Sequence, residues 1–356
     1  MSRRIIISGG GTAGSISPLL GVVDELRRRD PTINWLLVGT AAGPERDLAE
    51  IAGLPFHSIP AGKWRRYWSW KNFSDLGSLW QGFRAARQIV ASWRPDTIVT
   101  AGSYVSVPLV WAGKLAGSKI LIHQQDVRPG LANRLMAPAA DVITVTFEQS
   151  LRHFPAAKVR YTGNPVRADI LRGDPVEGRR LFQLQSGLPT LLVLGGSTGS
   201  SFLNHLVSAV AYRLVNDWQI VHLTGRDRDF VELQDERYHR YDFLTWEMPH
   251  AMAVANVVVS RVGLGTLTEL AALGKPCLFV PMPGTHQEDN AQLLAQLKAG
   301  LVVDQDQLNP ATFHEQLERL RKNAVERRVF GDNLHQLYRP DAVEQIGQVI
   351  LQLRPQ

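Results

Sequence analysis

The chain has 356 residues, of which 44% are hydrophobic and 20% are charged, and its formal net charge is +6 at pH 7. This length exceeds one ordinary hydrophobic core and fits two domains of typical size. The single cysteine, Cys277, excludes an intramolecular disulfide and favours a reducing compartment. The positive charge favours anionic partners such as phosphates or acidic lipid headgroups.

Short apolar runs rich in β-branched residues alternate with helical patterns along the whole chain. In the first half, strands are predicted at 4–8, 34–39, 96–100, 119–123 and 141–146, with a helix over 75–93. In the second half, strands are predicted at 190–194, 218–223, 257–260 and 277–280. This order is typical of parallel sheets covered on both faces. We therefore expect two Rossmann-like α/β domains, at 1–162 and 163–340, and a C-terminal segment, 341–356, whose helix is a candidate to pack back on the first domain.

Two features bear on membranes and export. The longest uncharged apolar stretch, 97–113, contains Gly, Ser and Pro and is shorter than the roughly 18–20 residues that span a bilayer. The first residues, Met1 to Arg4, are followed by a short apolar run and then glycines, which does not match an export signal. We expect a protein that neither crosses a membrane nor is exported.

Each half contains a glycine turn that follows a predicted strand and precedes a predicted helix. The first is Gly9-Gly10-Gly11-Thr12-Ala13-Gly14-Ser15, and the second is Gly195-Gly196-Ser197-Thr198-Gly199-Ser200. Glycine lets the backbone approach a phosphate closely, and a helix N-terminus offers unpaired N–H groups. Both turns are candidate anion sites.

Two other enzyme classes share these patterns. Gly9, Gly11 and Gly14 match the dinucleotide-binding spacing, but the strand at 34–39 ends in Gly39-Thr40 without the acidic residue that would bind the adenosine ribose. The second turn matches the G-x-S-x-G elbow of α/β-hydrolases. Two matching turns in two matching halves suit two facing domains better than one nucleophile on one sheet, although tight turns without a ligand remain an alternative.

Several groups of residues, in order along nearly the whole chain, resemble the MurG family of bacterial peptidoglycan glycosyltransferases. They are 10–14, Gly102-Ser103-Tyr104-Val105-Ser106, 123–126 with 130–134, Gly163-Asn164-Pro165-Val166-Arg167, 195–197, Glu269, and 286–288 with 290–291. The resemblance implies an inverting hexosyltransferase that moves N-acetylglucosamine from UDP-N-acetylglucosamine to an undecaprenyl-pyrophosphate-linked muramyl-peptide acceptor, without a cofactor. It also implies the GT-B type of fold, with two Rossmann-like domains facing across a cleft.

The resemblance further implies roles for single residues. The donor UDP-N-acetylglucosamine would be bound by Arg167, Gly196, Ser197, Leu244, Thr266, Glu269, Gln287 and Glu288, with Leu244 contacting uracil through its backbone. The acceptor would face Gly11, Thr12, Gly14, Tyr104 and Asn133. A related enzyme using a UDP-sugar on another acceptor, or a nucleotide-sugar 2-epimerase, is the alternative function.

The chain departs from the family pattern at the first turn and after the strand at 119–123. Ser15 stands where the family has a histidine, and Gln124 and Asp126 stand where the family has glutamate and asparagine. A serine hydroxyl is a poor base, whereas a carboxylate can accept the proton of the attacking hydroxyl. We therefore predict that Asp126 and Ser15 are the catalytic residues and that Asp126 is the general base. The alternative is that Asp126 caps a helix or binds an acceptor hydroxyl.

No His or Cys cluster has the spacing of a metal site. An acidic pair of the kind that a metal-dependent transferase needs occurs at Asp227 and Asp229, and we interpret it as a solvated loop. Positive potential for the leaving diphosphate can come from backbone N–H groups and helix dipoles instead.

Aromatic and basic residues alternate in the segment 63–73, Lys-Trp-Arg-Arg-Tyr-Trp-Ser-Trp-Lys-Asn-Phe. Trp and Tyr favour the bilayer interface, and basic residues favour anionic lipid. We predict that Trp64–Phe73 docks peripherally on an anionic membrane surface, at the cytoplasmic face of the plasma membrane. Stacking on single-stranded nucleic acid is a rival interpretation of this composition, which we do not favour, and a buried aromatic loop is another.

Overall fold

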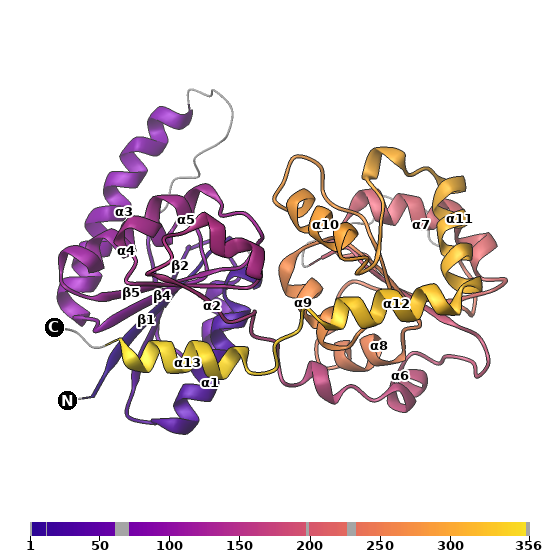
Figure 1. Ribbon diagram of the computed structural model, residues 1–356, viewed down its shortest axis with the longest axis horizontal. Helices are drawn as coiled ribbons and strands as arrows, with labels where there is room; N and C mark the ends of the chain where they lie inside the picture. The colour runs from indigo at the N-terminus through magenta and orange to yellow at the C-terminus, as the bar shows by residue number, and fades with distance from the viewer. Residues whose placement is uncertain (1, 12, 61–70, 197–198, 226–232, 354–356) are drawn as a thin grey trace. The chain divides into compact units, whose positions relative to one another are not determined.

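The computed structural model describes residues 2–11, 13–60, 71–196, 199–225 and 233–353, without the side chains of Ala13 and 71–79. The chain forms two compact units. The first comprises Met1–Pro165 together with Arg339–Gln356, and the second comprises Val166–Tyr338. Each unit contains its own parallel sheet (Figure 1).

The first sheet has the strand order β3-β2-β1-β4-β5-β6-β7, and every neighbouring pair is parallel. Its strands are β1 (Arg4–Ser8), β2 (Asn34–Gly39), β3 (Phe56–Ser58), β4 (Thr97–Thr100), β5 (Lys119–Gln124), β6 (Val142–Val145) and β7 (Val159–Tyr161). Ile6 of β1 lies opposite Leu36 on one side and Ile98 on the other.

Alternate residues of these strands enter two different cores, because successive side chains point to opposite faces. Ile6 packs with α3 (Lys71–Trp93), α4 (Ser106–Leu115) and α5 (Leu131–Met136). Ile5 and Ile7 pack with α1 (Ser17–Arg29), α2 (Glu45–Ile51) and α13 (Ala342–Gln352). The strands are therefore buried on both faces, which explains their continuous apolar sequences.

The C-terminal helix α13 belongs to the first unit and packs against α1. Ile346 and Ile350 are buried in the same core as Leu26 of α1. The Arg3 guanidinium donates hydrogen bonds to the carbonyls of Ile350 (2.6 Å) and Leu351 (2.9 Å). These bonds give additional donors to carbonyls in the last turn of the helix, where donors within the helix run out.

The second sheet has the order β10-β9-β8-β11-β12-β13 and is also parallel. Its strands are β8 (Thr190–Leu194), β9 (Gln219–Leu223), β10 (Tyr238–Tyr241), β11 (Val257–Ser260), β12 (Cys277–Phe279) and β13 (Leu301–Val302). The helices of this unit are α6 (Pro175–Leu181), α7 (Ser201–Leu214), α8 (Met248–Val254), α9 (Leu264–Ala272), α10 (Gln287–Gln296), α11 (Pro310–Lys322) and α12 (Ala324–His335). Leu206 of α7 and Phe313 of α11 share one core with the strands.

The predicted fold class, with two parallel-sheet Rossmann-like domains, is confirmed. All nine strands predicted from the sequence are present, within three residues at either end. Four further strands, β3, β7, β10 and β13, were not predicted, and each lies at an edge of its sheet in the part of the chain that the structure describes.

Candidate active site

Both glycine turns lie where the order of strands reverses. In the first sheet the chain moves outward from β1 to β2 and β3 on one side, and then continues from β4 on the other. In the second sheet β8 and β11 have the same relation. Ligands of open parallel sheets bind beyond the carboxyl ends of the strands at such a switch point. The turns follow β1 and β8, so each unit places its glycine turn at the expected ligand position.

Close packing explains the glycines of the first turn. A Cβ atom on Gly9 would lie 2.7 Å from Ile16, and one on Gly10 would lie 2.8 Å from Val105. Gly11 has φ +90°, which disfavours any side chain. The Gly10 N–H donates to Oγ of Ser15 (3.2 Å), so Ser15 stabilises the turn. Thr12 lies outside the described residues.

A hydrogen bond joins this turn to the loop after β5. The Gln125 side-chain amide donates to the carbonyl of Gly14 (2.9 Å). Ser15 follows Gly14, and Asp126 follows Gln125, so the two predicted catalytic positions lie on directly bonded loops at one edge of the sheet. Asp126 is half-buried. Its role as general base stays a prediction.

The departure at Gln124 has a physical explanation. Gln124 is 1% exposed, and its amide N–H groups donate to the carbonyls of Asp126 (2.7 Å) and Arg128 (3.2 Å). A carboxylate has no N–H and could not make these bonds. The Gln124 oxygen accepts from the buried side chain of Asn133 (2.6 Å). Asn133 therefore orders the loop that carries Asp126, and its predicted contact with the acceptor stays a prediction.

Tyr104 and Glu45 lie beside the first turn. Gly102 (φ +93°) lies in the loop that follows β4, and the half-buried Tyr104 stands two residues later in the same loop. Burial, followed by the charge of Glu45, raises the pKa of Tyr104 above its usual value, so its hydroxyl stays protonated at neutral pH. Glu45 was not identified from the sequence. The available signal was a carboxylate that opens a helix shortly after β2, which ends at Gly39.

The second turn differs from the first in its openness. A Cβ atom on Gly195 would lie 2.5 Å from the N of Ser200, and one on Gly199 (φ +79°) would lie 2.3 Å from the carbonyl oxygen of Thr224. A Cβ atom on Gly196 (φ +87°) would meet no described atom within 4 Å. Gly196 is therefore needed for its backbone angle, and no described atom fills the space that a side chain would take. Ser197 lies outside the described residues.

A buried arginine that the sequence analysis missed lies behind this turn. Arg261 follows β11 and is 6% exposed. It donates hydrogen bonds to Oγ of Ser200 (3.1 Å), to the carbonyls of Val280 and Pro281 (both 3.1 Å) and to Oε1 of Gln305 (2.8 Å). Within the described parts of the chain it forms no ion pair, and burial lowers its pKa. A buried charge with neutral partners is costly, and an anion at the adjacent helix N-terminus would compensate it.

The arginine was recognisable only weakly in the sequence. A charged residue stands immediately after the apolar strand 257–260, where a parallel sheet carries its functional side chains. Its position at the switch point could not be inferred until the strand order was known.

Arg167 and Glu269, both predicted at the donor site, form an ion pair. Nε of Arg167 donates to Oε1 of Glu269 (2.9 Å), and Nη1 of Arg167 lies 3.7 Å from Asp169. Burial raises the pKa of Glu269, and the Arg167 charge opposes that shift. Thr266 lies one turn earlier on α9 and is half-buried. The structure thus brings two of the predicted donor residues together.

Of the remaining predicted donor residues, Gln287 and Glu288 open helix α10 of the second unit, and Leu244 lies in a loop of the same unit. Gln287 accepts N–H groups from Val262 and Met282 (both 3.1 Å), so it joins the loops that follow β11 and β12. The exposed Glu288 accepts the N–H of Gly284 (3.1 Å). Leu244 is half-buried in the loop between β10 and α8. Contacts of these residues with uracil or sugar stay predictions.

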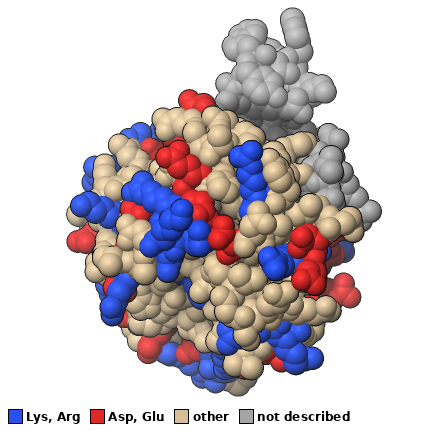
Figure 2. Space-filling model, turned by 90° about the vertical axis from the view of Figure 1, so that its right-hand side faces the viewer, with Lys and Arg blue, Asp and Glu red and all other residues tan. Residues whose placement is uncertain are grey.

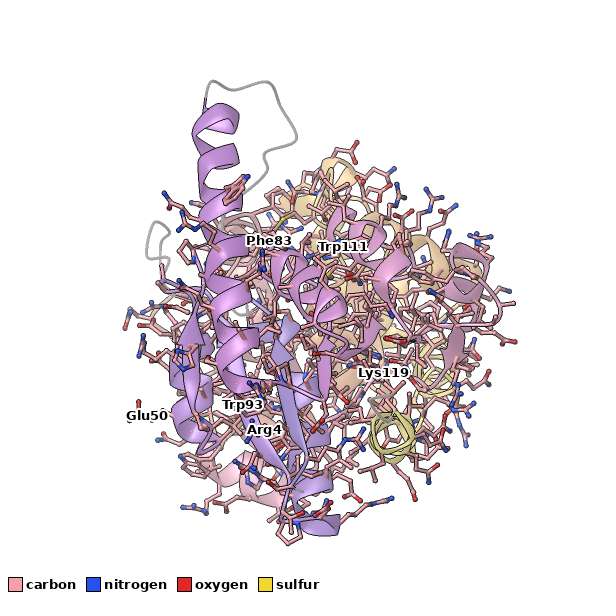
Figure 3. The ribbon with its side chains drawn as sticks, turned by 90° about the vertical axis from the view of Figure 1, so that its left-hand side faces the viewer. Arg4, Glu50, Phe83, Trp93, Trp111 and Lys119 are labelled. Atoms are coloured by element: carbon pink, nitrogen blue, oxygen red, sulfur yellow. The ribbon has the colours of Figure 1, made fainter. Side chains whose placement is uncertain are left out.

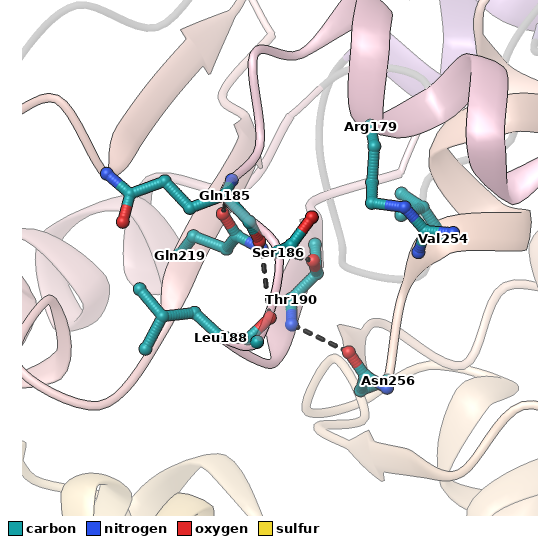
Figure 4. A pocket seen from close by; sticks show the side chains of 9 residues that line it. Arg179, Gln185, Ser186, Leu188, Thr190, Gln219, Val254 and Asn256 are labelled. Atoms are coloured by element: carbon teal, nitrogen blue, oxygen red, sulfur yellow. Dashed lines mark hydrogen bonds between the residues drawn. The ribbon is translucent and has the colours of Figure 1, made fainter.

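A cavity of about 290 Å³ lies at the other end of the second sheet (Figure 4). Its lining includes Thr190, Gln219 and Asn256, which stand at the amino ends of β8, β9 and β11. Their polar groups are already bonded, since the Thr190 N–H donates to Asn256 (2.8 Å) and Gln219 donates to the Leu188 carbonyl (2.9 Å). Ligands of parallel sheets bind at the opposite ends, so we place the site at the glycine turn.

Among the residues that the structure describes, no group of three or more His, Cys, Asp or Glu side chains is placed to hold a metal ion. Asp227 and Asp229 lie outside those residues.

Comparisons with known proteins identify the family. The model of the glycosyltransferase family 28 N-terminal domain matches residues 5–145, and that of the C-terminal domain matches residues 190–345. The UDP-N-acetylglucosamine–N-acetylmuramyl-(pentapeptide) pyrophosphoryl-undecaprenol N-acetylglucosamine transferase of Clostridium botulinum (strain Langeland) is 32% identical over 353 residues, which is 98% of each chain.

Similar solved structures show the same fold. Acinetobacter baumannii MurG has a TM-score of 0.76 at 22% identity, covering 98% of this chain and 99% of that one. A putative UDP-N-acetylglucosamine 2-epimerase from Listeria monocytogenes has a TM-score of 0.72 at 13% identity, covering 98% and 96%. Because of its similarity to the curated relative along nearly its whole length, the chain belongs to the MurG family of UDP-N-acetylglucosamine-dependent transferases, within glycosyltransferase family 28.

Proposed function

We propose that this protein transfers N-acetylglucosamine from UDP-N-acetylglucosamine to the muramyl sugar of an undecaprenyl-pyrophosphate-linked peptidoglycan precursor. The observation that carries the proposal is the 32% identity to a relative of that name over 98% of both chains. The site supports it, because each unit has a glycine turn at its switch point and a buried cation, Arg261, backs the second turn.

The second unit holds the donor in this proposal. The diphosphate lies over Gly196 and the N-terminus of α7, where backbone N–H groups and the helix dipole favour negative charge. Arg261 supplies a fixed positive charge behind this position. As the glycosidic bond to UDP breaks, charge develops on the diphosphate, and preorganised groups of this kind stabilise it without rearrangement.

The first unit holds the acceptor, and the reaction is a single displacement with inversion at the anomeric carbon. The acceptor hydroxyl attacks while UDP leaves, and Asp126 takes the hydroxyl proton. The hydrogen bond from Gln125 to Gly14 (2.9 Å) supports this assignment, because it keeps the Asp126 loop beside the turn.

One experiment tests the function directly. UDP release from UDP-N-acetylglucosamine is measured with and without the muramyl lipid acceptor, in the presence of EDTA. We expect release that depends on the acceptor and persists in EDTA. Formation of the 2-epimer without acceptor would instead identify an epimerase, and inactivation by EDTA that magnesium reverses would return attention to Asp227 and Asp229.

Replacement of Glu269 by glutamine is expected to weaken UDP binding at least tenfold. A neutral amide accepts weaker hydrogen bonds from ribose hydroxyls than a carboxylate does, and bonds to charged groups contribute about 1.5–3 kcal/mol. Calorimetric titration with UDP measures the change. Glu315→Gln, which removes an exposed carboxylate from α11 of the same unit, is the matched control. Equal affinities of the two variants would contradict the role of Glu269.

We also propose that the first unit docks on an anionic membrane surface. The described residues contain no helix that is both long and apolar enough to cross a bilayer. The predicted docking segment, Trp64–Phe73, lies outside the residues that the structure describes, except for the backbone of its last three residues. The segment continues directly into α3, however, and α3 belongs to a layer of helices with exposed apolar side chains.

This layer, which we call the outer-layer patch, comprises Trp80, Trp111, Leu115, Leu131 and Leu135, all exposed on the neighbouring helices α3, α4 and α5. Trp80 is 69% exposed, and Arg84 and Arg87 follow it at helical spacing on the same face. Figure 3 shows Phe83 on α3 and Trp111 on α4 in this layer. By contrast, Lys and Arg lie among Asp and Glu on the face of the second unit in Figure 2. The patch therefore combines apolar area with positive charge, as anionic lipid requires.

The double variant Trp80→Ala, Leu131→Ser is expected to bind anionic vesicles at least tenfold more weakly, since each large apolar side chain contributes about 1.5–3 kcal/mol when fully buried. Turnover of a water-soluble acceptor analogue should be unchanged. Tyr212→Ala with Val325→Ser, which removes exposed apolar residues from the second unit, is the control. A second set, Trp64, Trp68 and Trp70 to Ala, tests the predicted segment. Undiminished vesicle binding in both sets would refute membrane docking by this unit.

A further inference from the structure

A buried carboxylate already occupies the first glycine turn. Glu45 is 0% exposed although it opens helix α2. Its Oε1 accepts the N–H of Gly11 (2.6 Å), and its Oε2 accepts the hydroxyl of Thr40 (2.7 Å). The backbone donor that a bound phosphate would use at Gly11 is therefore taken by the protein's own side chain.

The surroundings are shaped for this carboxylate. A Cβ atom on Gly43 would lie 2.2 Å from Oε2 of Glu45, and one on Gly39 would lie 2.8 Å from its Cβ. Only glycine at these two positions leaves room for the buried side chain. The bond to Gly11 also satisfies a backbone N–H in a residue with φ +90°, so the carboxylate stabilises a backbone angle that few residues adopt.

The two glycine turns therefore have opposite charges behind them. Glu45 contacts the turn after β1, whereas Arg261 donates to Ser200 at the end of the turn after β8 (3.1 Å). Like charges repel strongly in a partly desolvated site. The charge of Glu45 acts beyond the turn, because it is one of the two causes that raise the pKa of Tyr104.

We propose that Glu45 is a positioning and specificity-determining residue, which fixes the first turn and makes it select an uncharged part of the acceptor, such as sugar hydroxyls, instead of a phosphate. The inference rests on the proposed function in placing the acceptor at the first unit. The second turn then remains the phosphate-binding turn of the protein.

The test uses the full chain with ¹⁵N-labelled glycine, titrated with inorganic pyrophosphate and followed by NMR. In the native protein, the signals of Gly195, Gly196 and Gly199 should shift, and that of Gly11 should not. In Glu45→Gln, which removes the charge and keeps the shape, Gly11 should shift at the concentrations that saturate Gly196. Glu45→Asp keeps the charge, so Gly11 should stay unchanged.

The matched control is Glu50→Gln, which removes an exposed carboxylate from the same helix (Figure 3) and should leave Gly11 unresponsive. With a soluble acceptor analogue, Glu45→Asp should raise the KM for acceptor and leave the KM for UDP-N-acetylglucosamine unchanged, because a shorter side chain loosens only the first turn. A general loss of folding would change both.

Two results would overturn the inference. A Gly11 signal that shifts in the native protein together with Gly196 would overturn it, and so would a folded Glu45→Gln protein whose Gly11 stays silent. Should Glu45→Gln not fold, the native titration still discriminates, because a phosphate-binding first turn must respond. If Gly196 fails to respond in every protein, the donor assignment is wrong, while the comparison at Gly11 remains valid.

Discussion

Replacement of Asp126 by asparagine is expected to lower turnover about a hundredfold to ten-thousandfold, the usual cost of removing a general base. The affinity for UDP should not change, because the donor residues belong to the other unit. Asp126 is the acidic side chain of the loop that Gln125 bonds to Gly14 (2.9 Å). The serine at position 15 already stabilises the turn through the Gly10 N–H (3.2 Å) and offers little basicity.

A double variant sharpens this prediction. Ser15→His with Asp126→Asn restores two of the three residues at which the chain departs from the family pattern, and we expect it to recover turnover that Asp126→Asn alone has lost. Single-turnover measurements with saturating donor separate the chemical step from binding. If Asp126→Asn alone keeps most of the turnover, the base lies elsewhere, and Asp126 only orders its loop or binds an acceptor hydroxyl.

Acidification from pH 6.5 to about 4 is expected to remove several kcal/mol from the free energy of unfolding, through two buried histidines. His123 of β5 bonds to Thr144 (2.9 Å) and Asn164 (3.0 Å), and burial lowers its pKa to about 4. His222 of β9 bonds to Tyr238 (2.7 Å) and Asn204 (3.1 Å). Burial, and secondly the charge of Arg240, lower the pKa of His222 to about 3.

The sign of the effect follows from linkage. Below pH 6.5 the unfolded chain binds a proton at each histidine, but the folded protein does not until its lower pKa is reached. Stability is therefore complete above pH 6.5 and falls as the pH falls, by on the order of 3 kcal/mol for each histidine by pH 4.

Urea unfolding between pH 7.5 and 4.5 measures this loss. His123→Gln and His222→Gln should each be less stable at pH 7.5, because they disturb buried hydrogen bonds. Each should also reduce the slope of unfolding free energy against pH by about one proton. His57→Gln, at an exposed position of β3, is the control. An unchanged slope in both buried-site variants would show that other groups cause the acid sensitivity.

Much of the fold was readable in the sequence, for a definite reason. The central strands are buried on both faces, so runs such as Ile5-Ile6-Ile7 and Leu191-Leu192-Val193-Leu194 are continuously apolar, and each runs into glycines that mark its end. The edge strands carry no such signal. Phe56–Ser58 and Val159–Tyr161 are short and partly exposed, and they are strands only because a neighbouring strand offers hydrogen bonds.

The same division applies to the site. By itself the sequence determined the two glycine turns and the family, because these depend on local patterns, and the resemblance pointed to Arg167 and Glu269 as donor-site residues. The structure then showed that these two side chains form an ion pair. Only the tertiary structure decided which charge lies behind each turn. Glu45 and Arg261 are ordinary charged residues in the sequence, and they acquire a function because the strand order buries them at the switch points. Burial strengthens the electrostatic interactions of a charged side chain, because it removes the water that would screen them. A local sequence pattern does not indicate which charged residues the fold will bury.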